Sequence, residues 1–294
     1  MKTISKVLKF ALLGLLAALM NPAPVFSADS NFQISPPPIA YPYFEAGRTD
    51  AKIEPMFLNI EANNISLSGG GVNFDARQAF SEQLAVDVQG NLLVLSGEMP
   101  GIPPLTPIPA YSGSTFLGYY TPQTTGKAKV GMMSIGMSLN VEFQPFHSDA
   151  GGLIIFGGPN INITRMTMQT PYRLYYPPST YYSGYTDTLT IASVTGGVQF
   201  GLQGDIALGS DVRISPFVMT STSSGSSTLT DDPGVSGVAD SSTTGDIPSS
   251  TTSSLGMDII MGNFSIGTVM QQMKAQSSTS DDVKITMFRM GYRY

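Results

Sequence analysis

From about residue 53 to residue 294, apolar and polar side chains alternate over stretches of roughly ten to fourteen residues, and each stretch ends in a turn. The side chains of a β-strand repeat with a period of two, so each stretch predicts a strand with one apolar and one polar face. The clearest case is 133–143, where Met133, Ile135 and Met137 alternate with Ser134 and Gly136. The sequence therefore predicts an all-β chain.

The connections between these stretches alternate between short and long. Short turns occur near Ser81, His147, Gly209 and Gly262, and the long insertions are 98–128, 167–187 and 221–253. We interpret 221–253 as a mobile loop, because Ser, Thr, Gly and Asp dominate it and such segments do not form a packed core. Short turns at one end and long loops at the other are typical of transmembrane barrels. We expect about ten antiparallel strands, with eight and twelve as alternatives.

The N-terminus predicts secretion. Lys2, Lys6 and Lys9 precede an apolar run at 10–20, which is followed by prolines and a small-residue exit at 25–28. This pattern is typical of a signal peptide, here residues 1–27. The apolar run is too short for a spanning helix, which needs ~20 residues. We expect 28–51 to be a Pro-rich periplasmic arm and 52–294 to be the barrel.

The last residues carry a family resemblance. Phe288, Met290, Tyr292 and Tyr294 share one face of the final predicted strand, and Arg289 and Arg293 share the other. The terminal aromatic residue on this alternation resembles the C-terminal signal that the barrel-assembly machinery of Gram-negative bacteria recognises. The resemblance implies an up-and-down β-barrel of the outer membrane, similar to small porins. Its implied partners are outer-membrane lipid, lipopolysaccharide and the assembly machinery.

A soluble two-sheet sandwich would also show alternation, with its polar face outward. A closed barrel with a polar interior needs an apolar exterior, for which lipid is the natural solvent. The predicted signal peptide, the terminal aromatic residue and the asymmetry of the connections together favour the membrane barrel.

Composition excludes several classes of function. The chain has no Cys and one His, so disulfides, a lipid anchor on cysteine and the usual soft-metal sites are excluded, and we expect no cofactor. Removing the predicted signal peptide takes away three lysines and no acid, which changes the net charge from −6 to −9. This charge argues against nucleic acid as a partner. The 31 Gly, 13 Tyr and 15 Phe suit a curved wall that faces lipid.

Catalysis lacks a convincing base. The only histidine, His147, lies in a predicted periplasmic turn beside Asp149. Barrel proteases and lipid A-modifying enzymes resemble this chain in architecture but keep their histidine at the outer rim. We therefore predict that the protein is not an enzyme. The tyrosines at 172–185 are predicted to form the outer aromatic girdle and the base of a loop.

The polar faces of the predicted strands carry the charges that would line the barrel lumen. Within membrane height a charge is costly unless it is paired or hydrated. The predicted lumen-lining residues are Asp75, Arg77, Asp87, Glu142, Asp205, Arg213, Asp258, Arg289 and Arg293.

Two interpretations of this set remain open. In one, the charges pair across the lumen and rigidify the barrel. In the other, they line a narrow hydrated pathway. The first functional hypothesis is accordingly a narrow porin-like channel for passive passage of ions or small solutes. The alternative is a structural or surface-interaction (adhesin-like) barrel with a plugged lumen, whose long loops contact partners.

Overall fold

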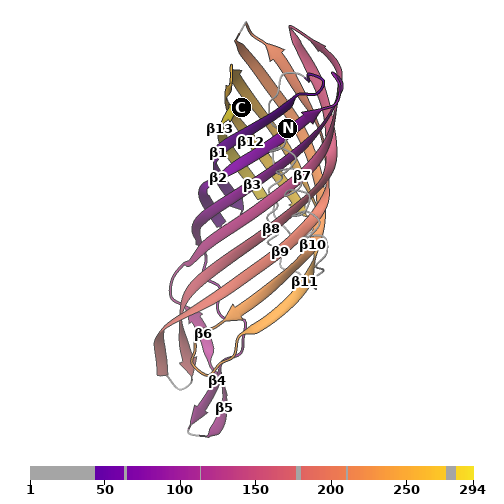
Figure 1. The fold of residues 1–294 in the computed structure, drawn as a ribbon. Coiled ribbons are helices and arrows are strands. Elements are labelled where there is room, and N and C mark those ends of the chain that lie inside the picture. The colour runs from indigo at the N-terminus through magenta and orange to yellow at the C-terminus, as the bar shows by residue number, and fades with distance from the viewer. Residues whose placement is uncertain (1–43, 63–64, 113, 177–179, 210, 276–282) are drawn as a thin grey trace.

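The computed structural model describes residues 44–62, 65–112, 114–176, 180–209, 211–275 and 283–294. These residues form a closed antiparallel barrel of ten strands, as predicted (Figure 1). The barrel strands are β1 (Thr49–Ala62), β2 (Ile65–Ala79), β3 (Leu84–Met99), β7 (Ala128–Ser148), β8 (Gly151–Tyr176), β9 (Thr180–Ala207), β10 (Val212–Asp232), β11 (Ser241–Met261), β12 (Phe264–Ala275) and β13 (Val283–Arg293).

Neighbours in sequence are neighbours in the wall, and the first and last strands pair to close it. β1 pairs with β13, from Lys52 opposite Arg293 to Glu61 opposite Lys284. Three short strands lie in the connection between β3 and β7, namely β4 (Pro109–Ser112), β5 (Thr115–Tyr119) and β6 (Thr121–Thr124). β4 and β5 form a separate hairpin, and β6 extends the sheet beside β8.

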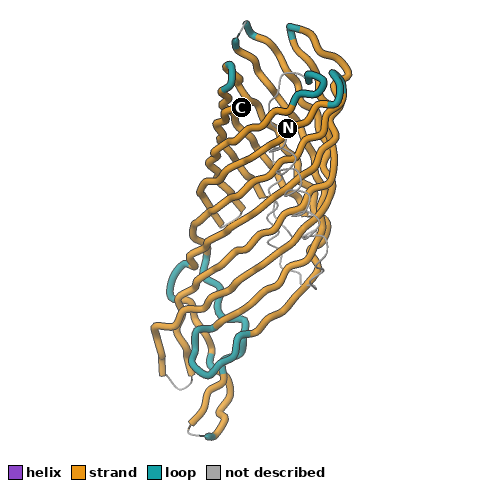
Figure 2. The backbone as a smooth tube through the Cα atoms, viewed as in Figure 1, coloured by secondary structure: helices purple, strands orange, loops and turns teal. Residues whose placement is uncertain are grey.

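The two ends of the barrel differ. At the first, which we call the turn end, short turns join β2 to β3, β7 to β8, β9 to β10 and β11 to β12. The turn between β11 and β12 is closed by Gly262, whose φ of 60° lies in the left-handed region that glycine adopts without strain. At the opposite end, the loop end, lie the β3–β7 connection and the β10–β11 connection, drawn as the longest teal segments in Figure 2. The predicted asymmetry of the connections is confirmed.

Two of the three predicted long loops are mostly strand, so these predictions were wrong. The tyrosine-rich stretch at 167–187 continues β8 and β9, which pair to Tyr176 opposite Thr180. The Ser/Thr-rich stretch at 221–253 forms the outer parts of β10 and β11, which pair to Asp231 opposite Ser241. In both cases a neighbouring strand supplies a backbone ladder along the stretch, and threonine suits a pleated sheet. Composition by itself contained no information on that pairing.

The start of the barrel also differs slightly from the prediction. β1 begins at Thr49, before the expected boundary at residue 52. Just ahead of β1, residues 45–48 form a turn that is tied to Ala79 by the Gly47 amide, at 3.0 Å. The predicted signal peptide and the arm up to residue 43 lie outside the described residues.

The exterior carries a belt of exposed apolar side chains around the half of the barrel nearest the turn end. Most of the apolar faces predicted for the strands are exposed, including that of the last strand, where Phe288, Tyr292 and Tyr294 are exposed and Arg289 is buried. The first strand is the exception, because its apolar face of Met56, Leu58 and Ile60 is buried inside the barrel. Other members of the belt are Phe57, Phe74, Leu92, Val141, Val198, Phe200, Leu202, Val218, Leu255 and Met270. The described part of the chain contains no helix long and apolar enough to cross a membrane.

Candidate functional site

The charged residues predicted to face the lumen all point into the barrel. Seven of the nine are almost completely buried, while Arg213 and Arg293 have about a fifth of their side chains exposed. Lys52 and Glu54 of β1, which the prediction missed, join them inside. Lys52, Glu54 and Met56 are alternate residues of β1, so the strand period places all three on one face of the strand. We call the following set the charged layer: Lys52, Glu54, Asp75, Arg77, Asp87, Glu142, Asp258 and Arg289.

One part of the charged layer is centred on Arg289 of β13. Its Nε donates to Asp258 Oδ1 at 2.9 Å, and its Nη1 lies 3.5 Å from Glu54 Oε2. Lys52 pairs with Glu54. Asp258 belongs to β11, so the Arg289 side chain passes over β12 to reach it. Gly267 of β12 makes this possible, because a Cβ there would stand 1.9 Å from Asp258 Oδ1.

The second part lies on β2, β3 and β7. Arg77 Nη2 donates to Glu142 Oε1 at 2.9 Å, and its guanidinium carbon lies 5.0 Å from the centre of the Phe44 ring. Gln89 donates to Asp87. No amide, hydroxyl or basic side chain donates to Asp75 in the described structure, and its side chain contacts that of Asp87, which is also acidic. Arg77 is engaged with Glu142, so this acidic pair is only partly compensated.

Two further ion pairs lie nearer the turn end. Arg213 Nε donates to Asp205 Oδ1 at 2.8 Å between β10 and β9. Arg293 Nε lies 3.7 Å from Asp50 Oδ1, which also accepts from Arg48 at 3.0 Å. The structure thus brings the predicted charges together as local clusters on neighbouring sectors of the wall.

Side-chain amides and hydroxyls line the next level toward the loop end. Gln199 Nε2 donates to Asn140 Oδ1 at 2.9 Å across β8, and Ser134 Oγ donates to Asn162 Oδ1 at 2.8 Å. Asn91 Oδ1 accepts the Gly136 amide at 2.9 Å. These hydrogen bonds give partners to some of the buried amide and hydroxyl groups, and they fix the side chains that face the lumen.

Farther toward the loop end the interior becomes apolar, which the sequence analysis did not predict. Nine of the ten barrel strands contribute to one contiguous cluster of buried apolar side chains, which we call the apolar band. Its members are Met56, Leu58, Ile60, Leu67, Leu93, Leu95, Val130, Met132, Phe156, Met166, Met168, Leu189, Ile191, Phe217, Met219, Val269, Met273, Val283, Ile285 and Met287. Met56, Leu58 and Ile60 continue the inward face of Lys52 and Glu54. The strand period by itself was therefore enough to place these apolar side chains inside the barrel.

The loop end is covered by the β3–β7 connection and by the tyrosines. Ile108 packs with Tyr172 and Leu174 of β8. The Thr106 amide donates to Asp231 Oδ2 at 2.6 Å. Tyr172 is buried inside this cap and donates to the Pro233 carbonyl, so its predicted place in an outer aromatic girdle was wrong.

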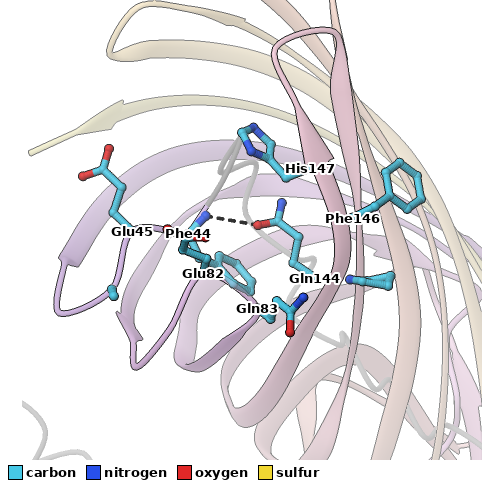
Figure 3. A pocket seen from close by; sticks show the side chains of 9 residues that line it. Phe44, Glu45, Glu82, Gln83, Gln144, Phe146 and His147 are labelled. Carbon is cyan, nitrogen blue, oxygen red and sulfur yellow. Dashed lines mark hydrogen bonds between the residues drawn. The ribbon is translucent and has the colours of Figure 1, made fainter.

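A cleft of about 570 Å³ lies at the turn end and contains the only histidine of the chain (Figure 3). There the Phe44 amide donates to Gln144 Oε1 at 3.2 Å, and His147 lies on the rim beside Gln144. Among the described residues, no three His, Cys, Asp or Glu side chains are arranged to hold a metal ion. The prediction that the protein is not an enzyme remains a prediction.

Closure of the sheet and the sorting of side chains together establish the class of protein. Every barrel strand pairs on both sides, so the wall has no open edge that would need water. The belt faces outward and the charged layer faces inward, which is the arrangement of a transmembrane barrel. The protein has the fold of a transmembrane β-barrel.

Comparisons with known proteins find solved structures of low sequence identity and low TM-score. No protein-family model and no curated protein sequence matches the chain. Among solved structures, the outer membrane protease OmpT of Escherichia coli aligns over 91% of this chain and 99% of its own, with 9% identity and a TM-score of 0.48. OprG of Pseudomonas aeruginosa aligns over 85% and 97%, with 11% identity and a TM-score of 0.38. An outer membrane channel of Pseudomonas putida F1 aligns over 88% and 99%, with 8% identity and a TM-score of 0.40.

Proposed function

We propose that the barrel provides narrow, passive passage for small solutes across the outer membrane, with the charged layer as its selective constriction. The observation that carries this proposal is the acidic pair of Asp75 and Asp87. A salt-bridge plug would place a basic group on each carboxylate, yet no amide, hydroxyl or basic side chain donates to Asp75 in the described structure and Arg77 is bound to Glu142. A buried acidic pair of this kind is costly, and hydration or a bound cation would stabilise it.

The same layer supports a preference for cations and neutral solutes over anions. Acidic side chains outnumber basic ones among its members. A lumen lined by an excess of carboxylates attracts cations and repels anions. The apolar band farther along the lumen raises the barrier for any ion, because apolar constrictions dewet. We therefore expect small current steps compared with those of water-filled porins.

The test is single-channel recording of the refolded mature protein in a planar bilayer under a KCl gradient. We expect small, cation-selective steps from the wild-type barrel. The double variant D75N/D87N should lose most of the cation preference, as read from the reversal potential. Asp246→Asn serves as the control, because Asp246 is exposed.

A folded, inserted barrel that passes no current at any salt concentration would contradict the channel proposal. The second candidate, a surface-interaction barrel with a plugged lumen, would then be favoured. One observation supports this candidate. The β4–β5 hairpin projects from the loop end with Tyr111, Phe116 and Tyr119 exposed and stacked edge to face (Figure 1). Exposed aromatic clusters of this kind are typical of binding surfaces.

A further inference from the structure

A groove of about 550 Å³ opens in the outer wall of the barrel, across β10, β11, β12 and β13. Its apolar lining comes from Val218, Leu255 and Met270, and each of these side chains is at least half exposed. Val218 lies opposite Leu255, and Leu255 lies opposite Met270. Residues opposite one another in register are neighbours on one face of a sheet, so these three form a continuous apolar surface on the outside.

The next row of outward residues toward the loop end is polar and begins with a small side chain. It consists of Ser253 of β11, Gln272 of β12 and Lys284 of β13, which also lie opposite one another and line the groove. Ser253 leaves room beside Leu255 that a larger side chain would fill. The groove therefore has an apolar side toward the turn end and a polar side toward the loop end.

Positive charge gathers on the polar side. Lys274 is exposed and lies two residues from Gln272 on the same face of β12, so it is a diagonal neighbour of the exposed Lys284. Diagonal neighbours lie about 7–8 Å apart, within reach of long side chains. Neither lysine forms a salt bridge with any other residue that the structure describes.

One acidic side chain lies close to this pair. Glu61 of β1 is opposite Lys284, and its Oε1 accepts a hydrogen bond from Asn59 Nδ2 at 2.9 Å. Two ammonium groups and one carboxylate leave a net positive charge beside the groove. A molecule that fits both sides of the groove must combine an apolar chain with an anionic group.

We infer that this groove binds one anionic lipid of the surrounding bilayer. An acyl chain lies against Val218, Leu255 and Met270, and the phosphate of the headgroup lies near Lys284 and Lys274. Ammonium groups are good partners for phosphate, and basic residues near a membrane surface attract anionic lipids. The groove lies on the outside of the wall, so this inference does not depend on passage through the lumen.

The test compares two lipids that differ only in the headgroup, anionic dioleoyl phosphatidylglycerol and zwitterionic dioleoyl phosphatidylcholine. Native mass spectrometry of the refolded mature protein, in micelles of an uncharged detergent, gives the dissociation constant of the first bound lipid. We expect one phosphatidylglycerol per barrel, bound about fivefold more tightly than phosphatidylcholine, because one net basic charge near a membrane surface contributes about that factor.

The double variant K274Q/K284Q tests the charged side of the groove. Its affinity for phosphatidylglycerol should fall about fivefold, to that of phosphatidylcholine or lower, while its affinity for phosphatidylcholine stays unchanged. Lys129→Gln is the matched control. Lys129 is exposed on β7, four residues beyond the exposed Met133, as Lys284 is four residues beyond Phe288 on β13. This control should keep the wild-type preference.

The variant Ser253→Leu tests the apolar side, because leucine fills the hollow beside Leu255. Both lipids should bind about tenfold more weakly, as expected when about two methylenes of the acyl chain lose their contact. The matched control is Ser96→Leu. Ser96 is exposed on β3, two residues beyond Val94, as Ser253 is two residues beyond Leu255 on β11. This control should bind both lipids as the wild type does.

Four results would overturn the inference. Equal wild-type affinities for the two lipids would show a general lipid contact, and an equal loss of preference in Lys129→Gln would show a diffuse charge effect. Wild-type binding of both lipids by Ser253→Leu would place the lipid elsewhere. Dimers in place of lipid-bound monomers would assign the groove to a second copy of the chain. The comparison of the two lipids on the wild type needs no variant, so it decides the matter even if a variant fails to fold.

Discussion

Arg289 contacts two carboxylates and is 1% exposed. Its guanidinium also lies 5.5 Å from the centre of the Phe217 ring on β10. One side chain of β13 therefore contacts residues of β1, β11 and β10. At the residue scale, the charged layer depends on such long side chains, which also join strands that share no backbone ladder, such as β13 and β11.

Replacing Arg289 with methionine should destabilise the barrel strongly. The variant leaves the carboxylates of Asp258 and Glu54 buried with less compensating charge, and breaking a buried ion pair by removing one partner costs about 3–5 kcal/mol. Reversible urea unfolding in lipid vesicles measures the loss. The control is Arg165→Met, because Arg165 is exposed on the outer face of β8. Equal stability of the two variants would show that the Arg289 network contributes nothing.

At the scale of elements, the loop-end cap is held by contacts between β8, β9, β10 and the β3–β7 connection. Asp187 of β9 and Asp231 of β10 are both 2% exposed, and Asp231 accepts the Thr106 amide of the cap. Asp187 lies beyond Val194, the last large apolar residue exposed on β9, and so lies outside the membrane belt. Burial, together with the nearby carboxylates of Asp231 and Asp232, raises the pKa of Asp187 to about 7.

The cap should loosen as pH rises. The folded-state pKa of Asp187 is above its unfolded value, so the folded state favours the protonated carboxyl. This contribution to stability is complete below pH about 4 and is lost as pH rises through about 7. We expect protease cleavage within 100–127 to accelerate between pH 5 and pH 8, about the pKa of Asp187.

The variant Asp187→Asn tests the assignment, because an amide does not titrate. Tyr172 also interacts with this carboxyl and packs against Tyr185, and both tyrosines keep their hydroxyls in the variant. Cleavage of the variant should therefore vary little between pH 5 and pH 8, after correction for the pH dependence of the protease on an unfolded substrate. If the variant retained the wild-type pH profile, Asp187 would not be the group that titrates.

At the scale of the whole molecule, the outer belt sets how the barrel lies in the membrane. On β9 the exposed apolar residues extend from Val194 to Ile206, with Val198 and Phe200 near the middle. Toward the loop end the same face changes to small and polar residues such as Ala192 and Thr190. β8, β9, β10 and β11 thus continue beyond the belt and carry the cap away from the lipid.

Arginine placed in the middle of the belt should be far more costly than arginine placed beyond it. Val198→Arg should lower the free energy of unfolding in lipid by about 2–4 kcal/mol. Ala192→Arg, which is outside the belt on the same face of the same strand, should change it by about 1 kcal/mol or less. Unfolding in lipid vesicles with guanidinium chloride compares the two. Equal losses of unfolding free energy in the two variants would contradict the assignment of Val198 to the belt and of Ala192 to the region beyond it.

The sequence by itself determined the turn-end half of the strands, most of their faces and the positions of the short turns. The period of two assigns each residue to a face, and Arg289 and Phe288 were correctly assigned to opposite faces from this period alone. The same period also indicated the nine inward charges. These properties are local, because they depend only on the spacing of residues along one strand.

Closure of the barrel decided which inward residues meet. Asp258 reaches Arg289 across Gly267 of β12, and the register of β10, β11 and β12 sets Thr252 opposite Ser221 and Ser254 opposite Gln271. The Ser/Thr-rich parts of β10 and β11 form strands because they pair with each other, which composition does not encode. Pairing and register are relations between distant segments, so only the tertiary structure determined them.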